Sequence, residues 1–127
     1  MTTMQPGDLV IASYKTGEYI AEVVEAGTNK LLVQIAAVVK HPMQGDLHNP
    51  HEADVPFFHQ RRALAFREKA NVPAAAVVPY TGDVPEYGQS LRRALEDEVG
   101  TLERQRAWID RCLTELDLLR QDYFGKA

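Results

Sequence analysis

Short apolar runs separated by turn residues make up most of the first 70 positions of the chain. Leu9 to Ser13 is mostly apolar, and Tyr19 to Glu25 mixes aromatic, β-branched and charged residues as a half-buried strand does. Leu31 to Val39 is apolar apart from Gln34, and its length and its Val and Ile content favour a buried strand over a helix. Such strands, with a turn about every 8–12 residues, predict a small barrel or sandwich of about five strands over roughly residues 6–70.

The end of this strand-rich region has two interpretations. Arg61 to Phe66 fits a last strand that would close a barrel, and it fits a single helical turn equally well. Composition then changes near Asn71, and Pro73 and Pro79 mark a connector. We therefore place a domain boundary between residues 72 and 73.

The last third of the chain has helical spacing. Asp83 and Glu86 have the side chains of an N-terminal capping box, and apolar residues then recur at intervals of four until Gly100 interrupts them. A second apolar stripe follows at spacings of three, four and seven, formed by Leu102, Ile109, Cys112, Leu113, Leu116, Leu119 and Tyr123. We predict two helices within roughly residues 84–124, packed as a hairpin or joined by a bend near Gly100.

Composition limits the classes of function. The chain has 127 residues, of which 45% are apolar, and this suits one soluble domain or one domain with a helical extension. The net charge is −4 and no stretch is strongly basic, so a nucleic-acid partner is disfavoured. Cys112 is the single cysteine, so no internal disulfide forms. No signal-peptide pattern opens the chain, and no apolar run reaches the roughly 20 residues that span a bilayer, so we expect a cytoplasmic protein.

The densest cluster of chemically active residues lies in the polar run from His41 to Pro73. All four histidines fall within it, beside aspartates, arginines and two adjacent phenylalanines. A strand or a helix does not need such a mixture, whereas binding residues concentrate on loops. We expect the functional surface in this run.

Metal binding is one alternative for the run. His48 and His51 lie three residues apart, flanked by Asp46 and Asp54, and imidazole and carboxylate suit zinc, manganese or iron. A metal site needs three or four ligands fixed by rigid elements, and the same side chains commonly cap loop amides instead. In this alternative a metal-binding domain or metal-dependent hydrolase would use His41, Asp46, His48 and Asp54.

Catalysis without a metal has weaker support. A histidine beside an aspartate can act as a base, but neither Ser13 nor Ser90 lies in a Gly-x-Ser-x-Gly motif. Cys112 lies on an apolar helical stripe, where a thiol behaves as a small hydrophobe. We therefore predict a protein with no catalytic residues and no cofactor.

Protein binding fits the run best. Phe57 and Phe58, followed by Arg61 and Arg62, combine apolar area with planar donors, and these residue types dominate interface hot spots. In a strand one of two adjacent phenylalanines must point inward, so we expect one to be buried and the other to be partly exposed. Trp108 is expected to pack between the helices and the barrel.

The residues of this run also resemble a known family, the kinase-associated lipoprotein B family. The resemblance spans almost the whole chain in length and order, although the carboxy-terminal helices match more loosely. It is carried by His41-Pro42, Gln44 through His48, Ala53-Asp54-Val55, Phe57-Phe58-His59, Arg61, Ala63-Leu64-Ala65, Arg67-Glu68 and, nearer the start, Tyr14-Lys15-Thr16-Gly17 with Tyr19-Ile20.

The resemblance implies both a fold and a function. Family members look like a small SH3-like β-barrel followed by a helical segment. The family is associated with activating a membrane sensor histidine kinase that feeds the sporulation phosphorelay, and it assigns no catalytic residues. Its name includes lipoprotein, whereas Cys112 here lies inside a predicted helix. We therefore expect no acylation, and we expect association with the inner face of the membrane only through the kinase.

Together these observations predict a mainly β fold with added helix. Residues 1–72 form an SH3-like β-barrel with the His-rich loop, and residues 73–127 form a connector and a helical hairpin that packs on the barrel or pairs two copies as a homodimer. The predicted function is non-enzymatic binding and activation of a sensor histidine kinase. The predicted contact residues are Asp46, His48, Asp54, Phe58, His59, Arg61 and Arg67. Besides the metal site, an SH3-like RNA-binding module is a third alternative, which the acidic balance disfavours.

Overall fold

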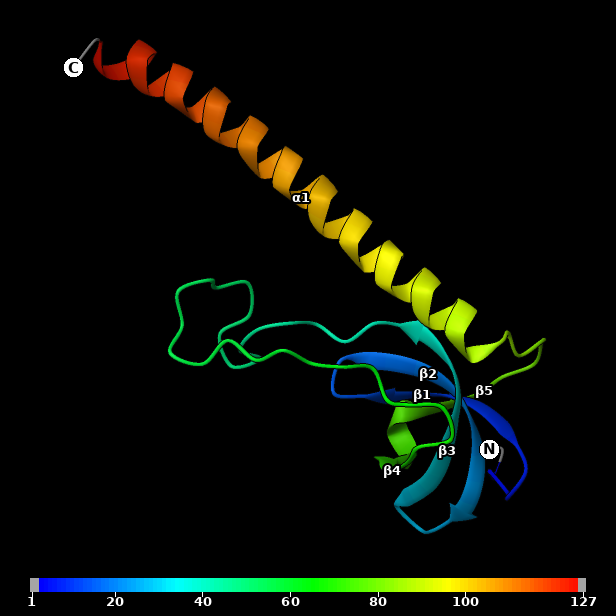
Figure 1. The fold of residues 1–127 in the computed structure, drawn as a ribbon. Coiled ribbons are helices and arrows are strands. Elements are labelled where there is room, and N and C mark those ends of the chain that lie inside the picture. The colour runs from blue at the N-terminus through cyan, green and yellow to red at the C-terminus, as the bar shows by residue number, and fades with distance from the viewer. Residues whose placement is uncertain (1–2, 126–127) are drawn as a thin grey trace. The chain divides into compact units, whose positions relative to one another are not determined.

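The computed structural model describes residues 3–125, which form a five-stranded antiparallel sheet and one long helix (Figure 1). The order across the sheet is β4-β3-β2-β1-β5. The elements along the chain are β1 (Leu9–Tyr14), β2 (Gly17–Ala26), β3 (Lys30–Lys40), β4 (Lys69–Pro73), the short 3-10 helix η1 (Ala74–Ala76), β5 (Val77–Pro79) and α1 (Tyr87–Phe124). The three strands expected in the first 40 residues are confirmed.

The core of the sheet follows from the alternation of side chains along its strands. In β1, Val10 and Ala12 point inward, and in β2 the same period places Tyr19, Ala21 and Val23 in the core. The inward residues of β3 and of the flanking elements complete this core: Leu31, Val33, Ile35, Val38, Val72, Val77 and Ala94. Burial of this one face is what fixes the register of the strands, since a slip by one residue would expose it.

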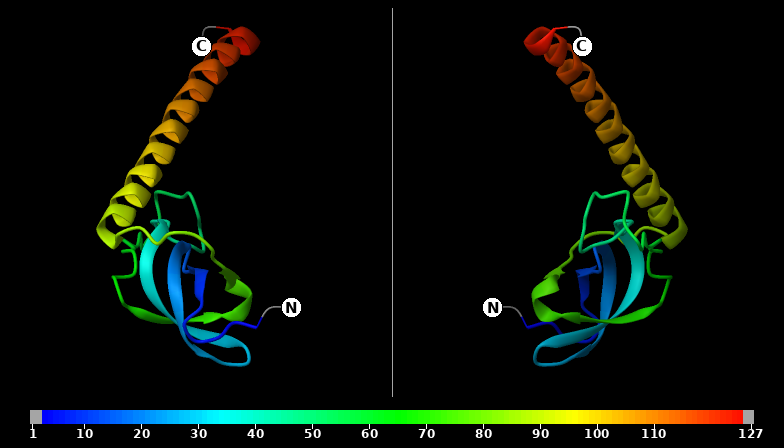
Figure 2. Two further views of the ribbon diagram at one scale, coloured as in Figure 1. Left: turned by 90° about the vertical axis from the view of Figure 1, so that its right-hand side faces the viewer. Right: turned by 90° about the vertical axis from the view of Figure 1, so that its left-hand side faces the viewer.

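The long β2–β3 hairpin is strongly coiled (Figure 2). Its register shifts at three places, between Glu18 and Tyr19, between Ile20 and Ala21, and between Val23 and Glu25. Bulges of this kind bend a strand and increase its twist. The bending lets the two strands curve around the core.

A closed SH3-like barrel is not confirmed in the described part of the chain. β4 and β5 are the two edges of the sheet, and each ends at a proline, Pro73 or Pro79. Proline has no N–H to donate to a ladder, so it belongs on edge strands. The fifth strand also lies beyond the predicted limit of residue 70, and Arg61 to Phe66 is neither a strand nor a helical turn.

The prediction of two helices is wrong. One helix begins at Tyr87 and runs through Gly100 to Phe124. A glycine inside a helix costs about 1 kcal/mol relative to alanine, and the surrounding Leu, Glu, Arg and Gln residues outweigh this cost. Trp108, which was expected to pack against a second helix, is 68% exposed on this single helix. None of the helices that the structure describes within residues 3–125 is long and apolar enough to cross a bilayer.

The start of α1 is tied to β3 by a serine. Ser90 is buried, and its hydroxyl oxygen accepts a hydrogen bond from the Val38 N–H at 2.9 Å while it donates to the Tyr87 carbonyl at 2.7 Å. Ala94 lies one turn further along and joins the core. Accordingly, the compact unit that contains the sheet extends to Leu95 instead of ending at residue 72, and a second unit begins at Glu96.

We expect Ser90→Ala to lower the free energy of unfolding by about 1–3 kcal/mol, because it leaves the buried Val38 N–H without an acceptor. Calorimetric unfolding would measure the change. Ser13→Ala, at an exposed position of β1, is the matched control and should change stability by less than about 0.5 kcal/mol. Equal effects of the two substitutions would contradict the role given to Ser90.

Candidate functional site

The connection between β3 and β4 holds every residue predicted to form the site. Residues 41–68 contain turns and bends but no strand or helix (Figure 1). Buried backbone groups must nevertheless find hydrogen-bond partners. Side chains provide many of these partners at two places in the connection. One is around Gln44 and Arg61, and the other is at Leu64, near the sheet.

Arg61 and Gln44 join the two arms of the connection. The Arg61 guanidinium donates to the carbonyl oxygens of Met43 and Gly45 at 3.1 and 2.5 Å. The Gln44 side chain accepts from the Arg61 N–H at 2.8 Å and donates to the Arg61 carbonyl at 2.9 Å. The predicted contact residue Arg61 therefore has its donors directed into the loop, where they fix its shape.

Gly45 forms a further backbone link between the two arms of the connection. Its N–H donates to the His59 carbonyl at 2.9 Å, and its φ of +102° is unfavourable for any residue with a side chain. An added Cβ would lie 3.0 Å from the ring of Phe58. The Phe58 ring therefore packs directly on the backbone of Gly45, which has no side chain, while 58% of Phe58 stays exposed.

Asp46 organises the turn that follows Gly45. One carboxylate oxygen accepts from the His48 N–H at 2.9 Å, and the other accepts from the Asn49 side chain at 3.0 Å. These hydrogen bonds, with the Asn49 amide first and the His48 backbone second, hold the pKa of Asp46 below its ordinary value of 3.8. The ionised form of Asp46 therefore stabilises this turn.

Arg67 is hydrogen-bonded to β3 through its backbone and not through its side chain. It has a φ of +69°, its N–H donates to the Ile35 carbonyl at 2.8 Å, and its own carbonyl accepts from the Gln34 side chain at 3.1 Å. The Ile35 N–H bonds to the Glu68 carbonyl at 2.9 Å. These contacts lead the chain into β4, while the Arg67 side chain lies at the surface.

The metal alternative finds no support in this geometry. Within residues 3–125, no three His, Cys, Asp or Glu side chains lie close enough together to hold an ion. Both carboxylate oxygens of Asp46 are engaged by the turn, and Nδ1 of His41 lies 3.0 Å from the Pro42 carbonyl. Asp54 is exposed. His41, Asp46, His48 and Asp54 therefore do not form a ligand set.

Phe57 and Phe58 are both exposed, which corrects the prediction of one buried ring. The exposed fractions are 72% for Phe57 and 58% for Phe58, because the segment is not a strand and neither side chain faces the core. The Phe57 ring stacks with the imidazole of His59, with the ring centres 6.4 Å apart and an angle of 18° between the planes. The result is an apolar surface on a backbone that Gly45 and Arg61 hold in place.

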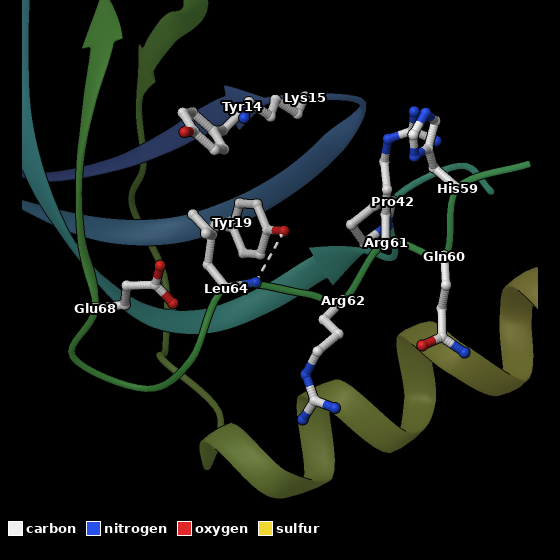
Figure 3. Close-up of a pocket in the computed structure, with 10 residues that line it drawn as sticks. All are labelled: Tyr14, Lys15, Tyr19, Pro42, His59, Gln60, Arg61, Arg62, Leu64 and Glu68. Atoms are coloured by element: carbon white, nitrogen blue, oxygen red, sulfur yellow. Dashed lines mark hydrogen bonds between the residues drawn. The ribbon is translucent and has the colours of Figure 1, made fainter. Parts of the chain in front are cut away.

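A cavity of about 520 Å³ lies beside this aromatic surface (Figure 3). Arg61 and Arg62 extend from neighbouring positions in opposite directions. The lining contains three Lys or Arg residues and His59 but only one carboxylate, although the chain as a whole is acidic. The residues that line it are Tyr14, Lys15, Tyr19, Pro42, His59, Gln60, Arg61, Arg62, Leu64 and Glu68.

Two tyrosine hydroxyls hold the base of the connection at Leu64. The Tyr19 hydroxyl accepts from the Leu64 N–H at 3.2 Å, and the Tyr87 hydroxyl donates to the Leu64 carbonyl at 2.5 Å. Burial is the main cause that raises the pKa of both phenols above 10.0, with the Glu68 carboxylate adding to it. Both hydroxyls are therefore protonated at neutral pH.

The structure brings together some predicted residues and adds others. Phe58, His59 and Arg61 lie together with Gly45, and Asp46 and His48 share one turn. Gln44, Tyr19 and Leu64 were not predicted as site residues. Their partners lie 17 to 45 positions away in the sequence, so periodicity gave no signal, although all three residues belong to the motifs that carry the family resemblance.

Comparison with known proteins confirms this resemblance over nearly the whole chain. The family model described as kinase associated protein B matches residues 14–124. A relative from Bacillus subtilis (strain 168), kinase-associated lipoprotein B, is 45% identical over 127 residues, with 99% of each chain covered. The X-ray crystal structure of kinase-associated protein B from Bacillus cereus is similar, with a TM-score of 0.68 and 35% identity over 95% of this chain and 98% of that one.

We expect Arg61→Lys to lower the free energy of unfolding by about 1–2 kcal/mol, because a lysine cannot span the carbonyls of Met43 and Gly45 as a guanidinium does. Hydrogen exchange should show faster exchange at the Gly45 amide. Arg62→Lys, at the exposed neighbouring position, is the control and should leave both quantities unchanged. Unaltered exchange at Gly45 in the Arg61→Lys protein would refute the cross-link.

Tyr19→Phe should alter the dependence of stability on alkaline pH. Because burial raises the pKa of the folded Tyr19 phenol above 10.0, the unfolded chain loses this proton first as pH rises. The contribution of the protonated Tyr19 phenol to the free energy of unfolding is therefore complete below pH 10.0, and it is lost as pH rises through the folded pKa. Denaturant unfolding between pH 7 and 11 should therefore show a shallower alkaline decline for Tyr19→Phe, besides a loss of about 1 kcal/mol at pH 7. Parallel curves for the two proteins would contradict this.

Proposed function

Because this chain belongs to the kinase-associated protein B family, we propose that it is a regulatory protein that binds a histidine kinase and performs no chemical step itself. The observation that carries the proposal is the exposure of Phe57 and Phe58 on a backbone already fixed by Gly45 and Arg61. An aromatic surface that is ordered before binding loses little conformational entropy on association. It is therefore suited to protein recognition.

We propose that the contact surface comprises the aromatic pair, His59 and the cationic rim of the neighbouring cavity. Lys15 and Arg62 give this rim a positive charge, which favours an acidic segment of the kinase beside an apolar anchor. Asp46, His48 and Asp54 lie on the same connection and provide polar contacts at its edge. Arg61 and Arg67 support the surface mainly by shaping the backbone.

The proposed partner is a membrane sensor histidine kinase that feeds the sporulation phosphorelay, and the proposed sign of regulation is activation. A bound regulator changes an equilibrium only by its differential affinity for the two states. A preference of about 1–3 kcal/mol for the active conformation would change the population ratio roughly 5- to 150-fold. In this proposal the protein reaches the inner face of the membrane through its partner.

Phe57→Ala should weaken binding to the cytoplasmic part of the kinase by roughly 30-fold, about 2 kcal/mol, because it removes an aromatic anchor. Calorimetric titration would measure affinity, and the rate of kinase autophosphorylation would measure activation. Phe58→Ala should weaken binding also, with some loss of loop order because its ring covers Gly45.

Phe124→Ala is the matched control, since Phe124 is exposed to a similar degree, 79% against 72% for Phe57, but lies at the end of α1. It should bind with unchanged affinity. If Phe57→Ala unfolds at the same temperature as the parent protein and binds and activates the kinase normally, the proposed surface is wrong.

A further inference from the structure

The part of α1 beyond Leu95 has an exposed apolar face. The only buried residues of the helix are Ser90 and Ala94. Apolar side chains after them are 48% to 67% exposed, namely Leu102, Ile109, Leu113, Leu116 and Tyr123. Large apolar side chains that gather, exposed, on one side of a helix mark a site of protein contact.

The spacing along this face is that of a coiled coil. Eight residues lie alternately three and four positions apart: Val99, Leu102, Arg106, Ile109, Leu113, Leu116, Arg120 and Tyr123. In heptad terms every d position is apolar, and the a positions alternate between an apolar residue and an arginine. A repeat of 3.5 residues fits the side of another helix, so the partner of this face is helical.

A parallel pairing of two copies in register is disfavoured by charge. It would place Arg106 directly against Arg106 of the second copy, and Arg120 against Arg120, because a positions face each other in parallel pairs. The g positions that flank such a pair offer only Gln105 and Cys112 near Arg106. No carboxylate at these positions compensates for the two arginine layers.

An antiparallel pairing removes this conflict, because each a position then faces a d position of the second copy. Centred at Arg111, it matches all eight stripe residues without overhang. The four distinct layers, each repeated by the two-fold axis, are Val99 with Tyr123, Leu102 with Arg120, Arg106 with Leu116, and Ile109 with Leu113. The stem of each arginine covers a leucine, and its charged end reaches the edge of the interface.

Carboxylates lie at that edge. The e positions, which adjoin the a positions on the helix surface, are Glu103, Asp110 and Asp117. In the antiparallel pair, Arg106 comes beside Asp117 of the second copy and Arg120 beside Glu103 of the second copy. Asp110 lies next to the two-fold axis and has Arg106 one turn away on its own helix.

We infer that residues 99–123 of α1 bind a second copy of this chain as an antiparallel coiled coil. This inference does not rest on the proposed kinase contact, which uses the β3–β4 connection. The dimer would present two copies of the contact surface to its partner. A dimeric regulator of this kind binds a two-fold symmetric partner with avidity.

The single cysteine provides a test in the unaltered full-length chain. Cys112 lies one position from the proposed axis and on the same side of the pair as Cys112 of the second copy, whereas a parallel pair would place the two thiols on opposite sides. A short bismaleimide should therefore yield a covalent dimer. Moving the thiol with Cys112→Ser and Glu98→Cys should abolish this product, because the two thiols would then lie about 39 Å apart along the axis at 1.5 Å per residue.

Sedimentation measurements provide the second test. The parent chain should sediment as a dimer, and Leu113→Asp should weaken self-association by at least about tenfold. Leu118→Asp is the matched control, since Leu118 is 55% exposed on the same helix but lies off the stripe. Circular dichroism would confirm that both variants keep the sheet.

A parent chain that sediments as a monomer would overturn the inference. So would a dimer that cross-links equally well through position 98 and through Cys112, because both are g positions and only a parallel pair makes them equivalent. A monomer that loses kinase binding when Leu113 is replaced would assign the stripe to the kinase instead. A dimer that persists in Leu113→Asp would likewise remove this face from the interface.

Discussion

The structure around the site depends on one constraint: the connection between β3 and β4 must satisfy its backbone polar groups without a ladder of its own. Side chains from distant positions provide the missing partners. Arg61 bonds to the carbonyls of Met43 and Gly45, and Gln44 bonds to both backbone groups of Arg61. Because each of these side chains serves two backbone groups, the loop has a defined shape although it has no regular secondary structure.

Tyr19 and Leu64 connect this loop to the rest of the sheet-containing unit. The ring of Tyr19 lies in the core while its hydroxyl accepts from Leu64, so the residue belongs to both the sheet and the loop. An added Cβ at Gly17 would lie 2.6 Å from the Tyr19 hydroxyl, so a glycine is required there. Tyr87 completes the junction from the first turn of α1. Displacement of Leu64 would therefore disturb the sheet, the loop and the helix start together.

The sequence predicted features that depend on local pattern and missed those that depend on distant contacts. Strands β1 to β3 and the apolar face of α1 follow from periodicity alone. The interruption at Gly100 was misjudged because one glycine costs less than the surrounding residues contribute to the helix. The polar run from His41 to Pro73 was placed in a loop, which is right for residues 41–68, whereas its last five residues form β4. The support given by Arg61 was not foreseen, since its partners lie 16 and 18 positions away and composition carries no information on such pairs.

The long helix has two apolar faces, and the angle between them explains why one remains exposed. Tyr87, Leu91 and Ala94 pack on the core at spacings of four and three, and a continuation of this face would pass through Glu98 and Thr101. The apolar stripe instead passes through Val99 and its heptad successors, one position later and thus rotated by about 100°. The face that packs on the sheet therefore ends near Leu95, and the following residues form a different surface. A single apolar stripe along the whole helix would indicate one packing partner. A change of apolar face within a continuous helix indicates two packing partners, of which the sheet is the first.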